Sequence, residues 1–198
     1  MMLSEHLREN VLRLEAAYSD CADVIFHDML IGGHTPAMLV YIEGLIRLDE
    51  LDRHVVEPLR DGPGPNSGLE TIRRQTAVAS VKTVDSFHRL VDEIADGCPA
   101  LLVDGHNAAL VFGLSDREQR AIEEPTAESV LRGPREGFIE TMRTNIALLR
   151  RKIRSPKLKV VTLRLGSSSK TPIAVMYVED IADPSLVREV MSRLERIE

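Results

Sequence analysis

The chain has no tryptophan, and only four phenylalanines and three tyrosines among its 198 residues. Proteins that hold nucleic-acid bases usually stack them on aromatic side chains, so neither a stacking platform nor a nucleic-acid partner is expected. Apolar residues nevertheless make up 43% of the chain. This share predicts a folded core built from Leu, Val, Ile and Ala.

Cysteine is equally scarce. The two cysteines, Cys21 and Cys98, lie far apart and in no metal-binding spacing. We expect two reduced thiols in a cytosolic compartment. The six histidines form no His-x-x-x-His pair, so no metal site is expected.

The recurrent motifs of catalysis and cofactor binding are also missing. No serine sits in a nucleophile elbow, and no Gly-x-Gly-x-x-Gly follows a predicted strand. Segment 166–170 contains Gly, Ser and Lys but lacks the terminal Gly-Lys-Ser/Thr of a phosphate loop, and it leads into a strand. We therefore expect a protein that is not an enzyme and that binds no cofactor.

No apolar run approaches the roughly 20 residues needed to cross a bilayer. Charged residues interrupt the N-terminal stretch at once, so no signal peptide is predicted. As given, the chain is expected to be soluble.

The apolar pattern switches repeatedly between strand and helix periods. It predicts an α/β fold of two mixed α/β lobes, each a small sheet with hairpins flanked by helices, over residues 1–118 and 119–198. In the first lobe, hairpins are predicted over 24–42 and 100–112, the second turning at Asp104-Gly105. A helix over 87–94 is expected to end at Gly97.

The second lobe is predicted to hold a helix over 138–153, two strands and a final helix that starts at Asp183-Pro184. Its second strand, 173–178, is apolar at every position, which is typical of a central strand covered on both faces. The final helix is expected to bury five apolar residues: Leu186, Val187, Val190, Met191 and Leu194.

Charge is distributed unevenly between the lobes. Residues 1–118 contain 10 Lys and Arg against 20 Asp and Glu, whereas residues 119–198 contain 15 against 11. Within 132–170 there are 11 basic residues and two acids. Such asymmetry bears on partners and on the docking of one lobe against the other.

Six arginines in and before the predicted helix are candidate docking residues for a partner or a membrane: Arg132, Arg135, Arg143, Arg150, Arg151 and Arg154. Spacings of seven and four residues place three of them, Arg143, Arg150 and Arg154, on one helical face. An arginine at the edge of a core can bury its stem and present its guanidinium group to a carboxylate or phosphate.

Three interpretations of this basic segment stay open. In the first, the arginines form structural ion pairs within the chain, with Glu123, Glu124 and Glu128. In the second, they dock an acidic partner or anionic lipid headgroups. In the third, they hold a phosphate ligand.

Several segments match one known family in order along the chain. The densest is Glu123-Glu-Pro-Thr-Ala-Glu-Ser-Val-Leu-Arg-Gly-Pro-Arg-Glu-Gly-Phe138, and others are Leu101-Leu-Val-Asp-Gly105, Tyr177-Val-Glu-Asp-Ile-Ala-Asp-Pro184 and Tyr41-Ile-Glu-Gly44. Together they resemble the A subunits of bacterial spore germinant receptors. A paralogous branch of spore membrane proteins shares this pattern.

The resemblance implies a hydrophilic N-terminal domain that precedes membrane-spanning helices. It implies a place at the spore inner membrane, with this domain on the cytoplasmic (core) side. The implied partners are the receptor B and C subunits and other A subunits, with an anionic lipid surface as a further candidate. The family carries no established catalytic residues.

The function we expect from the sequence is therefore non-enzymatic: subunit assembly and signal relay to the membrane part during nutrient-triggered germination. The alternative is a small-molecule domain that holds a nutrient in the cleft between the lobes.

Overall fold

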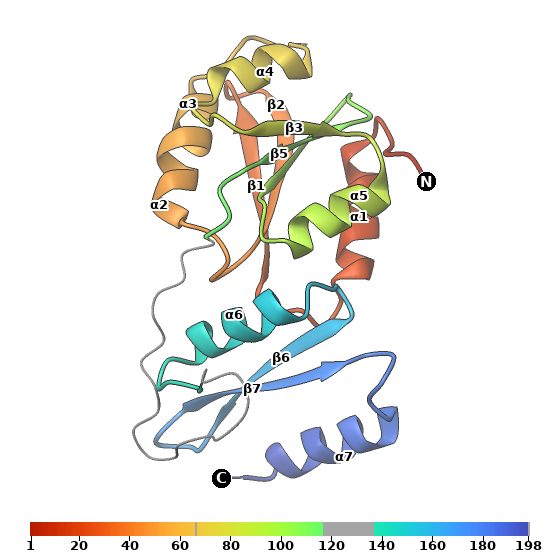
Figure 1. The fold of residues 1–198 in the computed structure, drawn as a ribbon, viewed down its shortest axis with the longest axis vertical. Helices are drawn as coiled ribbons and strands as arrows, with labels where there is room; N and C mark the ends of the chain where they lie inside the picture. The colour runs from red at the N-terminus through yellow and green to blue at the C-terminus, as the bar shows by residue number, and fades with distance from the viewer. Residues whose placement is uncertain (66, 117–136, 198) are drawn as a thin grey trace, which may run out of the picture.

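The computed structural model describes residues 1–65, 67–116 and 137–197, and Figure 1 shows how they are arranged. Helices and strands are interleaved along these described residues, as the sequence predicts. The first part holds α1 (Leu7–Ala17), β1 (Val24–Ile31), β2 (Thr35–Ile42), α2 (Leu48–Leu51), η1 (Asp52–Val56), α3 (Glu57–Arg60), α4 (Leu69–Gln75), β3 (Val81–Val84), α5 (Phe87–Ala95), β4 (Ala100–Val103) and β5 (Ala109–Phe112). The second part holds α6 (Met142–Lys152), β6 (Leu158–Leu165), β7 (Thr171–Val178) and α7 (Pro184–Leu194).

The first lobe is built on a five-stranded antiparallel sheet with strand order β1-β2-β4-β5-β3. Both predicted hairpins are present, as β1–β2 and β4–β5. The second turns at Gly105, whose φ of +80° is a conformation that glycine adopts without a Cβ penalty. The mixed α/β fold class is thereby confirmed.

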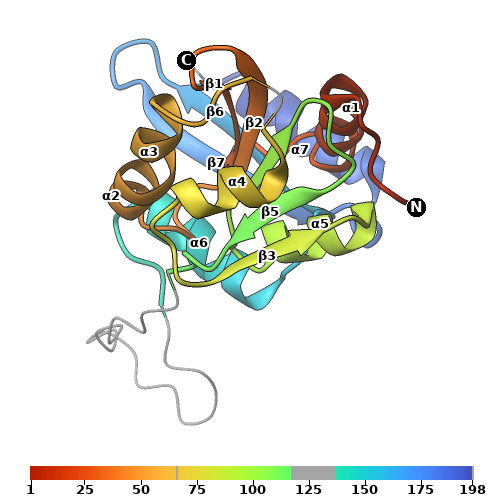
Figure 2. The same ribbon diagram turned by 90° about the horizontal axis from the view of Figure 1, so that it is seen from above.

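Side chains that alternate along the strands build a core on each face of this sheet. Val40 and Ala100 face the cluster that also contains Leu14 of α1 and Ile94 of α5. The opposite cluster contains Leu39 and Leu101 of the strands together with Leu51, Val55, Leu59 and Ile72 from the segment α2 to α4. Figure 2 shows α2 and α3 on one side of the sheet and α1 and α5 on the other.

The second sheet is a single hairpin, β6–β7, with all eight residues of each strand in register. The prediction that 173–178 is a central strand covered on both faces is wrong, because no residue of β7 is buried. β7 pairs only with β6 among the described strands, and its residues 173–178 are half-buried.

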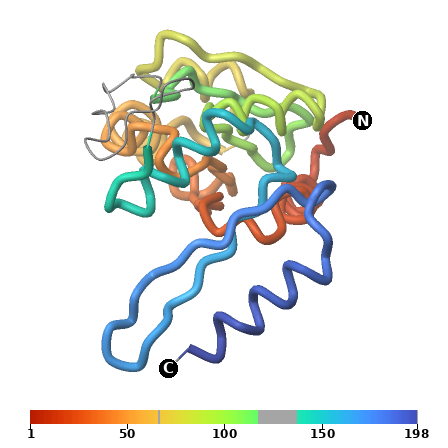
Figure 3. The backbone as a smooth tube through the Cα atoms, turned by 60° about the horizontal axis from the view of Figure 1, so that its bottom comes forward, coloured from red at the N-terminus to blue at the C-terminus, as the bar shows by residue number. Residues whose placement is uncertain are grey.

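The final helix begins where the sequence predicts, since the Asp183 carboxylate accepts hydrogen bonds from the Ser185 backbone N–H and hydroxyl, both at 2.7 Å. The expected burial of its apolar face is wrong: no residue of α7 is buried, and Leu186 is 61% exposed. The hairpin and α7 project together from the rest of the molecule, so little protein surrounds them (Figure 3).

Within the described ranges, no helix is long and apolar enough to cross a membrane.

Candidate functional site: the junction of α6 with the first lobe

The candidate site is the α6 junction, which we define as helix α6, the loop to β6, and the residues of the first lobe that they contact. The helix is anchored at its start by Asn145, whose side chain accepts from the Ile139 N–H at 2.9 Å and donates to the Ile139 carbonyl at 2.6 Å. Its last turn carries Arg150, Arg151 and Lys152, which complement the negative end of the helix dipole.

The apolar side of α6 packs on the first lobe. Ile146 and Ala147 are buried, and Ala147 belongs to the same core cluster as α1 and α5. Gly44 leaves room for this approach, because a Cβ at that position would lie 3.1 Å from the Ala147 Cβ. The helix is therefore fixed to the first lobe by packing as well as by charge.

Arg150 lies at the centre of the junction and is 1% exposed. Its guanidinium group forms a bidentate pair with the Asp23 carboxylate, with Nε–Oδ2 and NH2–Oδ1 distances of 2.7 Å, and NH1 donates to the Ser155 carbonyl at 3.1 Å. The Asp23 side chain is only 5% exposed. Both charges are thus withdrawn from water and satisfied by each other.

This geometry corrects the proposed role of Arg150 in docking an external partner. The guanidinium group already donates two hydrogen bonds to the Asp23 carboxylate. Because the Arg150 side chain is only 1% exposed, an acidic protein or a lipid headgroup cannot reach it. The helical-wheel argument placed Arg150 on a face shared with Arg143 and Arg154; all three pair with acids of the first lobe, but only Arg150 is buried.

The backbone next to Asp23 joins the two lobes directly. The Val160 N–H of β6 donates to the Asp20 carbonyl at 2.8 Å, and the Ala22 N–H donates to the Val160 carbonyl at 2.9 Å. Residues 20–22 thus pair with the outer edge of β6 through a short parallel bridge. The non-glycine residue Asp20 takes a φ of +55° to make this turn.

Cys21 is buried within the same bridge, and its thiol lies 3.5 Å from the Leu158 carbonyl. Burial raises the pKa of the Cys21 thiol, although Arg150 and Lys159 partly counteract this effect. A thiol held in its protonated form is a poor nucleophile.

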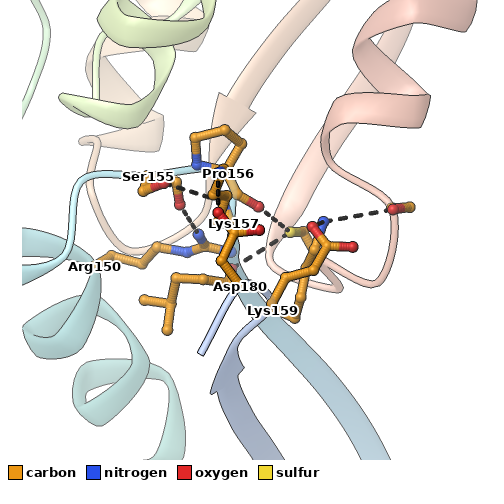
Figure 4. A network of polar contacts seen from close by, with 10 residues as sticks. Arg150, Ser155, Pro156, Lys157, Lys159 and Asp180 are labelled. Atoms are coloured by element: carbon orange, nitrogen blue, oxygen red, sulfur yellow. Dashed lines mark hydrogen bonds and ion pairs between the residues drawn. The ribbon is translucent and has the colours of Figure 1, made fainter. Parts of the chain in front are cut away.

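A second buried cation, Lys159, completes the network around the bridge. Its ammonium group lies 3.2 Å from the Glu179 carboxylate and 3.5 Å from the Ser19 hydroxyl. Figure 4 shows Lys159 entering from β6 and Arg150 from α6, with Ser155 and Pro156 above the Arg150 side chain in this view. At the edge of the network, Lys157 pairs with Asp180.

The other described arginines of the junction also meet acids of the first lobe. Arg143 pairs with Glu43 at 3.0 Å, Arg154 with Asp96 at 3.2 Å, and Arg151 with Asp116 at 3.8 Å. These pairs are more exposed than Arg150–Asp23, so each is worth little alone. All three arginines pair with acids of the first lobe, so the basic helix and the acidic lobe of the same chain are complementary in charge.

The remaining candidates, Arg132, Arg135, Glu123, Glu124 and Glu128, lie in 117–136, outside the described residues. The prediction that those glutamates pair with the arginines stays untested. The acids that do pair, among them Asp23 and Asp96, were not singled out by the sequence analysis. In the sequence, the only indication of these acids was the excess of Asp and Glu over Lys and Arg in residues 1–118.

A pocket of about 180 Å³ lies beside α6, lined by Asp96, Asp116, Arg151 and Arg154 together with Leu45, Ala95 and Ser115. It brings two acids and two bases to one place, but these side chains already form ion pairs across it. In the described part of the chain, no three His, Cys, Asp or Glu residues are grouped so as to hold a metal ion.

The chain matches a known protein family. Residues 12–198 match the family model described as Bacillus/Clostridium GerA spore germination protein. This chain belongs to that family. The expectation drawn from the sequence segments is confirmed.

The chain is similar to spore germination protein KA of Bacillus subtilis, with 33% identity over 100% of this chain and 37% of that protein. It is also 33% identical to stage V sporulation protein AF of Bacillus subtilis, over 81% of this chain and 33% of that protein. The chain thus spans well under half the length of these relatives.

A solved structure has the same fold: the N-terminal domain of the A subunit of the Bacillus megaterium spore germinant receptor GerK3. The TM-score is 0.79 at 25% identity, over 100% of this chain and 74% of that one. The GerA family chain described here is therefore similar to an N-terminal domain of a germinant receptor A subunit, and this family is not a known enzyme family.

Proposed function

We propose that this chain acts as the N-terminal domain of a germinant receptor A subunit and works without covalent chemistry, by assembling with neighbouring subunits and relaying a signal to the membrane part. We assign it to the A-subunit branch rather than the paralogous branch because the solved domain that covers its full length comes from an A subunit. The proposed location is the inner spore membrane, with this domain on the core side.

The buried Asp23–Arg150 pair is the observation that carries this proposal. It joins the start of the first sheet to the helix that leads into the second hairpin, at the point where residues 20–22 also bridge to β6. A displacement of the first lobe therefore also moves β6, because the buried ion pair and the backbone bridge connect the two without a flexible linker. The division into lobes at 1–118 and 119–198 stays part of the proposal, with α6 held by the first lobe.

We propose protein subunits as the partners, namely the B and C subunits and other A subunits, in preference to anionic lipid. Arg143, Arg150, Arg151 and Arg154 each pair with an acid of the first lobe, so their charges are partly neutralised at short range. Vesicle flotation tests this preference. Binding that requires anionic lipid and weakens with salt would contradict it.

The proposal is tested in spores that carry the full-length protein as their only copy. Asp23→Asn leaves the Arg150 charge buried without its counter-charge, so we expect at least about a tenfold lower rate of nutrient-triggered germination and weaker co-purification of the B and C subunits. Arg154→Gln removes an exposed pair of the same junction and serves as the matched control, with a change below about twofold.

The amount of A subunit in the spore membrane fraction is measured in parallel. If Asp23→Asn does not accumulate, the double variant Asp23→Leu with Arg150→Met replaces the pair by apolar side chains, which proteins often tolerate. Spores with a normal amount of either variant that germinate at the native rate would overturn the relay role.

A nutrient-binding domain is the second candidate, and the charged pocket beside α6 is the observation that favours it. A zwitterionic amino acid would have to displace the Asp96–Arg154 and Asp116–Arg151 pairs. A ligand at 100 times its dissociation constant stabilises its protein by about 2.7 kcal/mol. A thermal-shift screen with amino acids, sugars and nucleosides therefore detects such binding, and Arg154→Gln should abolish it.

A further inference from the structure

A second cavity, of about 340 Å³, lies in the first lobe where β3, β5 and the end of α5 meet. We call it the α5 cavity. It is larger than the 180 Å³ pocket beside α6, and its volume falls in the range of small-molecule sites, roughly 300–1,000 Å³. Most of its lining residues carry polar side chains: Ser80, Lys82, Glu93, Cys98 and Ser115. A ligand suited to this lining is therefore polar as well.

The segments around the α5 cavity are held in place by the sheet and by backbone hydrogen bonds. Lys82 of β3 lies opposite Val111 of β5 in the register, and Val111 also belongs to the core cluster beneath α5. The Cys98 N–H donates to the Glu93 carbonyl at 3.0 Å, which fixes the loop that leaves the helix. Because these segments are already ordered, a ligand would bind without a large cost of ordering the protein.

A glycine allows two of these segments to approach each other closely. The Gly113 N–H donates to the Ser80 carbonyl at 2.8 Å. A Cβ on Gly113 would lie 2.8 Å from the Ser80 Cβ and 2.9 Å from its hydroxyl oxygen, which is too close for a real contact. A larger residue at position 113 would therefore displace Ser80 and change the shape of the cavity.

The charged groups of the α5 cavity form one ion pair, in which the two side chains differ in exposure. The Lys82 Nζ lies 2.7 Å and 2.9 Å from the two carboxylate oxygens of Glu93. The Glu93 side chain is 18% exposed, whereas that of Lys82 is 58% exposed. The hydrogen bond to Glu93 raises the pKa of Lys82, so its ammonium group stays charged. Glu93 is thus part of the cavity wall, and Lys82 reaches it from the solvent side on a flexible stem.

This pair indicates the charges that a ligand must carry. A ligand with an ammonium group alone would bind Glu93 but leave the displaced Lys82 without a counter-charge. A ligand with a carboxylate alone would bind Lys82 but leave Glu93 unpaired beside a second negative charge. A zwitterion supplies both charges, so each side chain keeps a partner and the net charge of the cavity does not change.

Sugars fit this lining less well. None of the described residues that line the α5 cavity is aromatic, so a sugar ring would find no stacking surface there. The hydroxyl groups of Ser80 and Ser115 can instead donate hydrogen bonds to a carboxylate.

We propose that the α5 cavity binds a small zwitterion of the α-amino-acid type, whose ammonium group binds Glu93 and whose carboxylate binds Lys82. This inference does not rest on the relay role of the α6 junction. It also concerns a different place from the charged pocket beside α6, although Ser115 lines both. The experiment therefore has to separate the two pockets.

Two-dimensional NMR of the 198-residue chain tests the proposal with three ligands that share one carbon skeleton. L-valine carries both charges, isobutylamine lacks the carboxylate, and isovalerate lacks the ammonium group. We expect L-valine to cause saturable shifts of the amide signals of Cys98, Gly113 and Ser115. The other two ligands should bind at least about tenfold more weakly, because each leaves one charged side chain without a partner.

Two variants of the ion pair assign the site. Lys82→Met keeps most of the exposed stem but removes the charge, so it should weaken the binding of L-valine about tenfold or more. Glu93→Gln should do the same, and if this variant does not fold, the exposed position 82 still provides the test. Arg74→Met removes the cation of an exposed pair with Glu70 on α4 and is the matched control, with unchanged binding.

Three outcomes would overturn the proposal. The first is the absence of saturable shifts at the amides around the α5 cavity. The second is equal binding of the three ligands, which would show that the ion pair does not select a zwitterion. The third is binding of L-valine that persists in Lys82→Met but is lost in Arg154→Gln, which would place the ligand in the pocket beside α6 and support the second candidate function instead.

Discussion

At the scale of single residues, the junction depends on one buried ion pair. A buried pair adds little net stability, because the cost of removing two charges from water offsets their attraction. Breaking it is costly, however, by about 3–5 kcal/mol, since one charge is left buried without its partner. The Asp23–Arg150 pair therefore contributes more to fixing the position of α6 on the first lobe than to the free energy of unfolding.

Cys21 provides a test of burial at the same place. Burial raises the pKa of its thiol in the folded protein above the ordinary value of 9.0. Above that pH the unfolded chain loses the proton while the folded chain keeps it, so the free energy of unfolding falls as the pH rises toward the folded pKa. Below pH 8 the thiol is protonated in both states, and its contribution does not change with pH.

We expect Cys21→Ala to have a shallower loss of stability than the native protein between pH 8.5 and 10. The difference in slope is at most one proton, about 1.4 kcal/mol per pH unit. Urea unfolding at a series of pH values measures it. Parallel curves for the two proteins would show that the thiol ionises equally well in the folded state.

At the scale of elements, glycine determines where α5 ends. Gly97 has a φ of +83°, and a Cβ there would lie 3.0 Å from the Cβ of Leu45. Gly105, in the β4–β5 turn, has nearly the same φ of +80° but no atom within 4 Å of a built Cβ. The two positions thus differ in packing and not in backbone conformation.

Gly105→Ala is expected to cost about 1–2 kcal/mol, which is the penalty of a left-handed conformation. Gly97→Ala should cost about 1–3 kcal/mol more, because it also overpacks the contact with Leu45. Chemical unfolding of both variants measures the two costs. Equal losses would mean that Leu45 moves aside freely.

At the scale of the whole molecule, charge holds the basic helix on the acidic lobe. Exposed pairs such as Arg143–Glu43 and Arg154–Asp96 are screened by salt, whereas the buried Asp23–Arg150 pair is screened much less. The packing of Ile146 and Ala147 is independent of ionic strength.

We therefore expect the native radius of gyration to be the same at 50 mM and 1 M NaCl in small-angle X-ray scattering. Asp23→Asn weakens the salt-resistant contact, so this variant should expand at 1 M NaCl while Arg154→Gln should not. Expansion of the native protein with salt would show that the exposed pairs are the main attachment.

The pattern of the first lobe could be predicted from local sequence because its signals are local. The apolar runs 37–42 and 100–103 predict strands, and Asp104-Gly105 predicts the tight turn that follows β4. The second lobe was predicted less well. An apolar strand such as 173–178 has the same sequence whether its neighbours are present or missing, so its pattern alone could not reveal an open edge.

By itself, the sequence determined the order of helices and strands, the absence of recognisable catalytic motifs and the family, since each is carried by residues close together in the chain. Only the tertiary structure decided which charges meet. Asp23 and Arg150 are separated by 127 positions, and an ion pair at that separation depends on how two packed lobes bring their surfaces together. For the same reason the sequence left open whether the basic helix pairs within the chain or docks a partner, and the folded chain shows its described arginines paired with acids of the first lobe.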